Sequence, residues 1–357
     1  MKRTATLLAG LLLVTGTVFA AEWTVTGARV ETNTTLVDTQ NGVGGVNGGD
    51  LDLEVKAEKT GAYGTVGLVL QNDKDDDTDL RLTYSKTEGD WTVATEALLV
   101  DSNGDLLGQN KTDEGNMNKG DGIYIKWNVM GSKTTTLTIY PYEVGGLSWD
   151  NDTWESFKDN ARHKDGGLAL ATKVGESDLA VRLVTANDET TTKNQYTLKG
   201  DFSTKVGTAK LAVAAGYASG FKTTMAAAKV EMPVSKLTVN AELNTQKTDK
   251  ADTAVGAFVK GSYKLAAVNG YNPTAYVSFL MMNEEAAALD AGKATTVAGV
   301  GEYTEIEAGL GLNKGSFTIT PKVVINNSDE KIYGKEDGST NSEKAAMAAK
   351  ITVTYKM

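Results

Sequence analysis

The sequence predicts an all-β protein, a transmembrane antiparallel β-barrel of about 16–18 strands. Apolar and polar residues alternate along many segments of about ten residues, the length that a tilted membrane-spanning strand needs. The connections between these segments are alternately short and long, and aromatic residues gather at one end of the segments. Alternation indicates strands because successive strand side chains point to opposite faces of a sheet.

Residues 1–20 are expected to form a cleaved secretory signal peptide. Lys2 and Arg3 precede an apolar run, and the residues up to Ala20 resemble a small-residue cleavage site. The apolar run is too short to span a bilayer, although an N-terminal membrane anchor is the alternative interpretation. Residues 21–357 are expected to form a single outer-membrane β-barrel domain.

The composition excludes several classes of protein. Lys and Arg number 36 against 46 Asp and Glu, so the net charge is −10 and becomes −12 without the signal peptide. An acidic chain is a poor partner for nucleic acid. The absence of cysteine rules out disulfides and thiolate metal sites. After the signal peptide no segment approaches the roughly 18 continuous apolar residues of a membrane helix, so only a closed barrel could cross a bilayer.

The alternation recurs from the first predicted strands to the last residues. In the final segment Ile351, Val353 and Tyr355 would share one face, and the threonines and lysines between them would share the other. This pattern predicts the closing strand of the barrel. In residues 317–325, Pro321 interrupts the pattern because proline cannot donate a ladder hydrogen bond. The clearest alternating segments are LDLEVKAEK (51–59), DLRLTYSK (79–86), IYIKWNV (123–129), KLTVNAELN (236–244) and FTITPKVVI (317–325).

Connection lengths follow a regular rhythm. Short turns are expected at VGES (174–177), PVS (233–235) and NKGS (313–316), whereas NEEAAALDAGKATT (283–296) and NNSDEKIYGKEDGSTNSEK (326–344) are long and polar. Outer-membrane barrels have short periplasmic turns, long external loops and an even number of strands. The rhythm therefore places both chain ends on the side of the short turns.

Aromatic residues mark the side of the short turns. These are Tyr63, Trp91 and Phe317 at the beginnings of strands, and Phe202, Tyr263 and Tyr355 near the ends of others. A row of rings at one edge is typical of the girdle at a membrane–water interface. A soluble β-sandwich, the alternative fold, would need neither this row nor the rhythm of connections.

The whole-chain pattern resembles bacterial outer-membrane general diffusion porins. The segment from Pro141 to Gly146 is similar to the Pro-Glu-Phe-Gly-Gly sequence of the third external loop of these porins, which folds into the lumen and narrows it. The last segment resembles the C-terminal sorting strand of outer-membrane proteins, with Met357 in place of a terminal aromatic residue. The resemblance implies the outer membrane of a diderm bacterium, contact with its lipid, and a homotrimer.

The segment after Pro141 is the candidate constriction loop. Asp152 and Glu155 are spaced as a helix N-cap and its capping-box partner, and Trp154, Phe157 and Ala161 would form one apolar stripe. By the predicted strand count this is the fourth long connection, not the third. The candidate constriction residues are Glu143, Trp149, Asp150, Asp152, Trp154, Glu155, Phe157, Asp159, Arg162, His163 and Lys164.

Charged residues on the polar face of the strands are expected to line the lumen. A dry interior could not hold so many ions, whereas a water-filled barrel of this size can. Opposed basic and acidic groups would set an electric field across the constriction. The sequence does not decide whether the channel would prefer cations or anions. The candidate pore-lining residues are Glu54, Arg81, Glu96, Lys126, Arg182, Lys199, Lys229, Glu242, Lys260, Glu305, Glu307, Lys322 and Lys350.

Nothing in the sequence indicates an enzyme, a metal or a cofactor. The single histidine, His163, has no serine nucleophile motif near it. The acidic stretches DKDDDTD and DSNGD suggest calcium, but neither continues with the Gly at position six and the Glu at position twelve of an EF-hand loop. The predicted function is passive diffusion of ions and small hydrophilic solutes. A non-conducting surface, adhesive or structural barrel is the alternative. A sugar channel would need an aromatic track, and only Tyr124, Tyr140 and Tyr276 would face the lumen.

Overall fold

The computed structural model describes residues 23–38, 47–72, 78–100, 122–140, 167–188, 193–219, 222–249, 252–286, 302–327 and 346–356. Among these residues no helix is long and apolar enough to cross a bilayer. A 3₁₀ turn, η1, spans Val129–Gly131. The strands are β1 Thr24–Asp38, β2 Asn47–Gly61, β3 Gly64–Asn72, β4 Thr78–Glu88, β5 Trp91–Val100, β6 Gly122–Asn128, β7 Thr135–Tyr140, β8 Gly167–Val174, β9 Ser177–Asp188, β10 Lys193–Val206, β11 Ala209–Ala218, β12 Thr223–Val234, β13 Leu237–Lys247, β14 Thr253–Lys264, β15 Asn272–Met282, β16 Tyr303–Lys314, β17 Phe317–Asn326 and β18 Ala346–Lys356.

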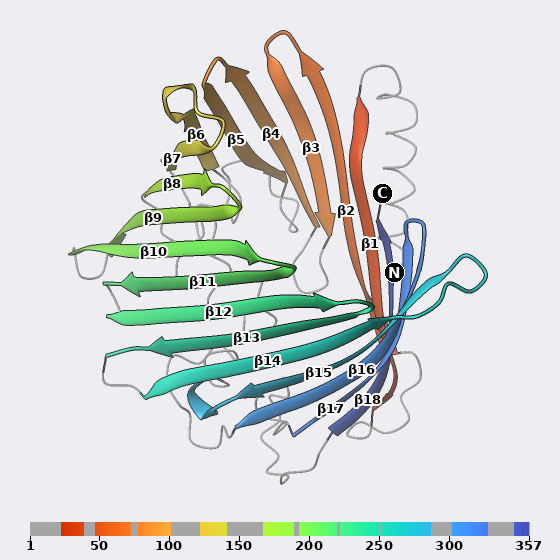
Figure 1. Cartoon of the computed structure of the whole chain (residues 1–357). Coiled ribbons are helices and arrows are strands. Elements are labelled where there is room, and N and C mark those ends of the chain that lie inside the picture. Colours follow the sequence, from red (N-terminus) through yellow and green to blue (C-terminus); the bar gives the residue numbers. More distant parts are fainter. Residues whose placement is uncertain are drawn as a thin grey trace.

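The strands form a single closed antiparallel barrel (Figure 1). Each strand pairs with its neighbours in the sequence, and β1 also pairs with β18, where Val30 lies opposite Tyr355. The described residues thus make an 18-stranded sheet, as the alternation predicts. Closure leaves no sheet edge with unpaired backbone groups, which is the condition for strands to cross a bilayer.

Short turns join the strands at one end of the barrel. Between β8 and β9 the turn is Gly175 and Glu176, and between β10 and β11 it is Gly207 and Thr208. The two glycines have φ of 62° and 63°, a conformation that a side chain makes costly. The start of β1 and the end of β18 lie at this same end, since Thr24 pairs with Glu58 near the β2–β3 turn. The predicted placement of the short turns is confirmed.

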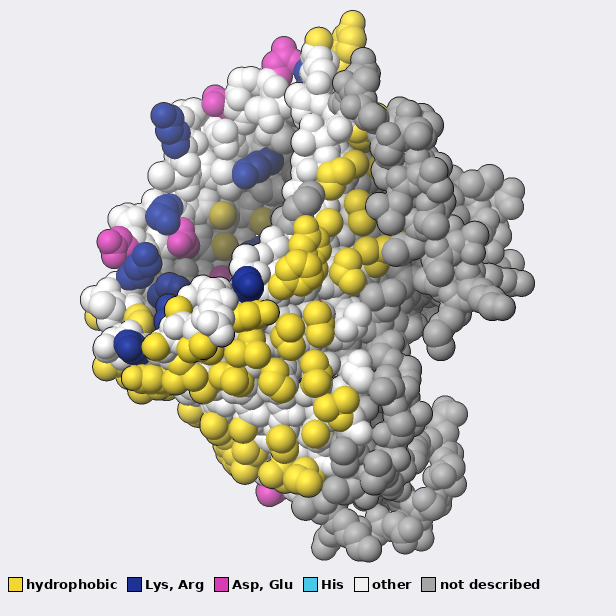
Figure 2. Space-filling view, turned by 90° about the vertical axis from the view of Figure 1, so that its right-hand side faces the viewer, with side chains coloured by type: hydrophobic (Ala, Val, Ile, Leu, Met, Phe, Trp, Pro, Cys, Tyr) yellow, Lys and Arg dark blue, Asp and Glu magenta, His cyan; other side chains and the backbone are white. Residues whose placement is uncertain are grey.

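The outer wall of the barrel is apolar. Val259, Phe279, Ile306 and Ile325 lie side by side on β14–β17, and their exposed fractions are 48%, 43%, 46% and 41%. Figure 2 shows hydrophobic side chains spread over this outer face, while charged side chains gather about the hollow. So wide an apolar surface is unfavourable in water but suits contact with lipid tails. A soluble β-sandwich is excluded because the strands form one closed sheet, not two packed sheets.

An aromatic row encircles part of the turn end. The rings of Trp91 and Trp127 stack with centroids 5.4 Å apart, and those of Phe317 and Tyr355 lie 4.8 Å apart. Tyr63, in the β2–β3 turn, is 87% exposed. Amphipathic rings at one rim are typical of the boundary between lipid and water.

Pro321 locally weakens the sheet. On its β18 side it pairs with Ile351, but the register between β16 and β17 skips from the Gly309–Lys322 pair to the Leu312–Ile319 pair. The gap follows from the missing N–H of proline, which removes one ladder hydrogen bond. The wall remains closed because the β17–β18 ladder is continuous.

Candidate functional site

The strand register places the candidate pore-lining residues on one face of the sheet, opposite the apolar outer wall. Lys199 lies directly opposite Arg182, and Lys229 directly opposite Glu242. Paired residues in a ladder point to the same side, so the register can be followed round the ring. For Glu96 only its ladder position opposite Thr83 is described. The inner wall of the barrel is therefore rich in charge.

One inner cluster joins Arg182 of β9 to Lys199 and Asp201 of β10. The Asp201 carboxylate accepts hydrogen bonds from Arg182 and from Lys199, whose Nζ is 3.1 Å from Oδ1. Like charges directly opposite each other repel, and Asp201 offsets this repulsion because it binds both cations. Sequence reasoning missed Asp201, although it lies on the same strand face as Lys199.

A second inner pair links neighbouring strands β12 and β13. Lys229 Nζ lies 2.6 Å from Glu242 Oε1, and the Glu242 side chain is only 1% exposed. A carboxylate this buried is stable only when charged or polar partners replace its water. The ion pair therefore holds these two side chains of β12 and β13 in place on the inner face.

A third inner cluster surrounds Glu307 on β16. Tyr276 donates its hydroxyl hydrogen bond to Glu307 at 2.6 Å, and Lys322 donates to the other carboxylate oxygen at 2.8 Å. Lys260 Nζ lies 4.5 Å from the centroid of the Tyr276 ring, a cation–π arrangement. Gly309 makes room for that ring, since a Cβ there would come within 2.5 Å of it.

Part of the inner wall is covered. Thr197 and Asn244 are fully buried, and Thr223 and Gln246 are each 4% exposed. Ladder register puts Thr197 and Asn244 on the same face as Lys199 and Glu242, since each lies two residues away on its strand. Open water would leave such polar side chains accessible. These side chains of β10–β13 are therefore shielded from solvent on the inner face.

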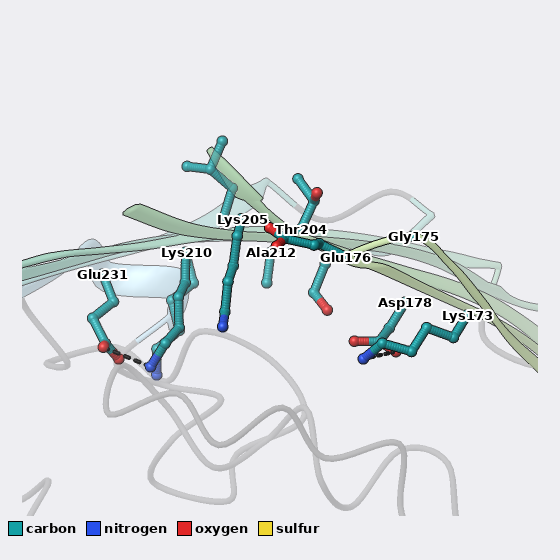
Figure 3. Close-up of a pocket in the computed structure, with 12 residues that line it drawn as sticks. Lys173, Gly175, Glu176, Asp178, Thr204, Lys205, Lys210, Ala212 and Glu231 are labelled. Atoms are coloured by element: carbon teal, nitrogen blue, oxygen red, sulfur yellow. Dashed lines mark hydrogen bonds and ion pairs between the residues drawn. The ribbon is translucent and has the colours of Figure 1, made fainter. Parts of the chain in front are cut away.

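A cavity of about 370 Å³ lies at the turn end of the inner wall (Figure 3). Two ion pairs flank it: Lys173 Nζ is 3.4 Å from Asp178 Oδ1, and Lys210 Nζ is 2.7 Å from Glu231 Oε1. The sequence analysis did not single out these four residues, although the alternation puts them on the polar strand face. The cavity is lined by Lys173, Gly175, Glu176, Asp178, Ser203, Thr204, Lys205, Lys210, Leu211, Ala212, Lys229 and Glu231.

Neither a protein-family model nor a curated protein sequence matches the chain. Solved structures do match it. OpdK of Pseudomonas aeruginosa, solved with vanillate, has a TM-score of 0.56 over 95% of this chain and 99% of its own, at 10% identity. The anion-selective porin of Comamonas acidovorans has a TM-score of 0.51 over 94% and 100%, and OccK3 (OpdO) of Pseudomonas aeruginosa 0.54 over 93% and 94%, each at 10% identity. The chain has the porin fold.

The porin fold gives the candidate constriction segment a defined place in the chain order. The residues from Glu143 to Lys164 that were singled out lie between β7 and β8, outside the described residues. The earlier long connections join β1 to β2, β3 to β4 and β5 to β6, so this is the fourth. Its position therefore differs from that of the third loop of general diffusion porins, and its role stays a prediction.

The described part of this porin-fold chain holds no group of three or more His, Cys, Asp or Glu side chains that could bind a metal ion. The single histidine, His163, lies outside that part. Among the described residues the chemistry of the inner wall is thus that of lysine, arginine, carboxylate, amide and hydroxyl groups.

Proposed function

We propose that the protein is an outer-membrane porin through which ions and small hydrophilic solutes diffuse passively. The observation that carries the proposal is the contrast between the two faces of the closed sheet. Its outer face is a continuous apolar surface, and its inner face bears the charged residues from Glu54 to Lys350. An apolar exterior binds lipid, and a charged interior requires water.

The number of strands supports an aqueous channel. Barrels of about sixteen to eighteen strands are wide enough that their side chains do not fill the interior. The inner ion pairs keep partial access to water, since the Lys322 and Arg182 side chains are 25% and 32% exposed. Side chains whose charges are paired remain hydrated, but they attract a passing ion less strongly than unpaired charges would. This arrangement suits passive diffusion.

The covered stretch of inner wall supports a narrowed lumen. The buried side chains of Asn244 and Gln246 support this proposal, because a wide open lumen would leave polar groups of β13 accessible to water. We propose that the segment from Glu143 to Lys164 narrows the channel, as the resemblance to general porins implies. Its short amphipathic pattern, with Trp154 and Phe157 on one face, suits packing against a wall.

The cellular setting belongs to the same proposal. Residues 1–20 would be cleaved on export, and the barrel would reside in the outer membrane of a diderm bacterium. The exposed apolar band supports contact with lipid, and the aromatic row at the turn end supports an interface on the periplasmic side. A homotrimer is implied by the resemblance to general diffusion porins.

A non-conducting surface or structural barrel is the second candidate function. The observation that favours it is the same covered wall, because a segment that filled the lumen completely would also bury Thr197 and Asn244. Long acidic connections would then serve as binding surfaces for partners. Conductance separates the two candidates.

Single-channel recording tests the proposal. The mature protein is inserted into a planar bilayer under a KCl gradient, and folding is checked beforehand by heat-modifiable mobility on a gel. We expect stepwise, long-lived conductance, with steps grouped in threes if the assembly is a trimer. A folded barrel that inserts but never conducts would contradict the porin proposal and support the second candidate.

A further inference from the structure

We propose that the turn-end cavity is a binding site for small zwitterions of the amino-acid class, held between Lys205 and Glu176. The inference rests on the proposed function, since the cavity opens on the lumen and solutes would meet it near the turn-side mouth. It adds a class of solute to that function. The ligand would place its carboxylate on the lysine and its ammonium on the glutamate.

Among the described residues, Lys205 and Glu176 are the cavity charges without an ion-pair partner. Lys173 pairs with Asp178, Lys210 with Glu231, and Lys229 with Glu242 outside the cavity. Neither Lys205 nor Glu176 has an ion-pair partner within 4.0 Å among the described residues. In Figure 3 both side chains extend into the same space without a dashed line, with Lys210 on the far side of Lys205. Within the part of the chain that the structure describes, the cavity thus offers one unpaired cation and one unpaired anion.

The strand register explains why these two charges face each other without touching. The β9–β10 ladder ends where Ser203 pairs with Asp178, and continuing it by two residues would put Lys205 opposite Glu176. Glu176 lies in the β8–β9 turn beside Gly175, which has a φ of 62°, so it stands outside the paired part of the ladder. The charged atoms of Lys205 and Glu176 are farther apart than the 4.0 Å of an ion pair. Opposite charges held apart across a cavity suit a molecule that carries both charges itself.

The remaining lining leaves room for a solute and limits the alternatives. Ala212, on β11, contributes only a methyl group, and the cavity volume of about 370 Å³ holds a small organic molecule. A simple anion would bind Lys205 but would be repelled by the carboxylate of Glu176. A simple cation would bind Glu176 but would be repelled by Lys205. A zwitterion alone satisfies both, so the charge pattern favours it.

The experiment compares three probes of similar size on the conducting protein: alanine, propionate and propylammonium. Each probe is added on the side of the bilayer that the short turns of the barrel face, while brief interruptions of the KCl current are recorded. We expect alanine to interrupt the current at about tenfold lower concentration than either singly charged probe, as two charge-assisted hydrogen bonds require. Lys205→Gln and Glu176→Gln should each remove this advantage. The exchanged double variant Lys205→Glu/Glu176→Lys should restore it.

Lys236→Gln is the matched control, because Lys236 is an exposed turn lysine that does not line the cavity. It should leave the alanine response unchanged. Equal responses to all three probes, or an alanine response that survives Lys205→Gln, would overturn the zwitterion site while conductance upholds the porin. Conductance failure would instead count against the proposed function, and alanine titration of the folded barrel in detergent then decides on the site alone. Absence of alanine binding there, or alanine binding that Lys205→Gln leaves unchanged, would also overturn the site.

Discussion

Lys322 on β17 and Lys350 on β18 lie directly opposite each other on the inner wall, and Glu307 pairs with Lys322. Glu307 accepts a hydrogen bond from Lys322 at 2.8 Å, whereas Lys350 has no ion-pair partner among the described residues. Two like charges in one cross-strand pair destabilise a sheet. This part of the inner wall therefore carries a local excess of positive charge among the described residues.

Replacement of Lys350 by glutamate should change ion preference. The variant exchanges a repulsive pair for an attractive one opposite Lys322, so the local field becomes negative and cations gain access. We expect the reversal potential under a KCl gradient to move towards the potassium equilibrium potential. Lys314→Gln is the control, since Lys314 lies over the Tyr271 ring on the outer rim. An unchanged reversal potential in Lys350→Glu would show that this pair lies outside the conducting path.

Glu242→Gln should destabilise the barrel. The substitution leaves Lys229 without its carboxylate at a side chain that is 1% exposed, and we expect a loss of about 1–3 kcal/mol in the free energy of unfolding. Guanidinium unfolding in detergent, followed by tryptophan fluorescence, measures it. Glu231→Gln removes a partner of Lys210 from a pair that is 35–57% exposed, and should cost less than about 1 kcal/mol. Equal losses in the two variants would refute the role of burial.

Gly309→Ala should disturb the cluster around Glu307. A Cβ at this position would lie 2.5 Å from the Tyr276 ring, so the ring must move and its 2.6 Å hydrogen bond to Glu307 must break. Overpacking of this kind costs about 1–3 kcal/mol. Gly261→Ala on β14 is the control, because no atom lies within 4 Å of its added Cβ. The unfolding midpoint should fall only in Gly309→Ala, and Tyr276→Ala in the same chain should recover part of the loss.

The faces of the strands could be predicted from the sequence because the side-chain period of a strand is two. Once Leu237 is assigned to the outside, Glu242 must point inside, whatever the neighbouring strands do. The rhythm of connections added the antiparallel order and the side of the chain ends. These properties depend on residues close together in the chain, so they can be predicted from one sequence.

The partners of the inner charges could not be predicted in the same way. Asp201 binds Arg182 across a strand boundary, and Lys210 binds Glu231 across another. Such contacts depend on the stagger between strands, which closure of the whole barrel determines. Alternation places Lys205 on the correct face, but it does not reveal that Lys205 lies beyond the last pair of the β9–β10 ladder, without a carboxylate partner among the described residues.

Deletion of residues 147–163 tests the predicted constriction. If this connection between β7 and β8 narrows the lumen, its removal should raise single-channel conductance and admit larger neutral solutes. The strands that flank it end at Tyr140 and begin again at Gly167, so the deletion leaves enough residues to join them. Liposome swelling with sugars of increasing size measures the exclusion limit.

A deletion of similar length within residues 328–345, between β17 and β18, is the matched control. It shortens another long polar connection, but this one lacks the tryptophan and phenylalanine stripe that suits packing against a wall. Both variants should remain heat-modifiable barrels, since neither loses a strand. A constriction in the β7–β8 connection requires the exclusion limit to rise in the first variant alone. Equal limits in the two variants would place the constriction elsewhere, and the covered wall at Asn244 would then need another segment to explain it.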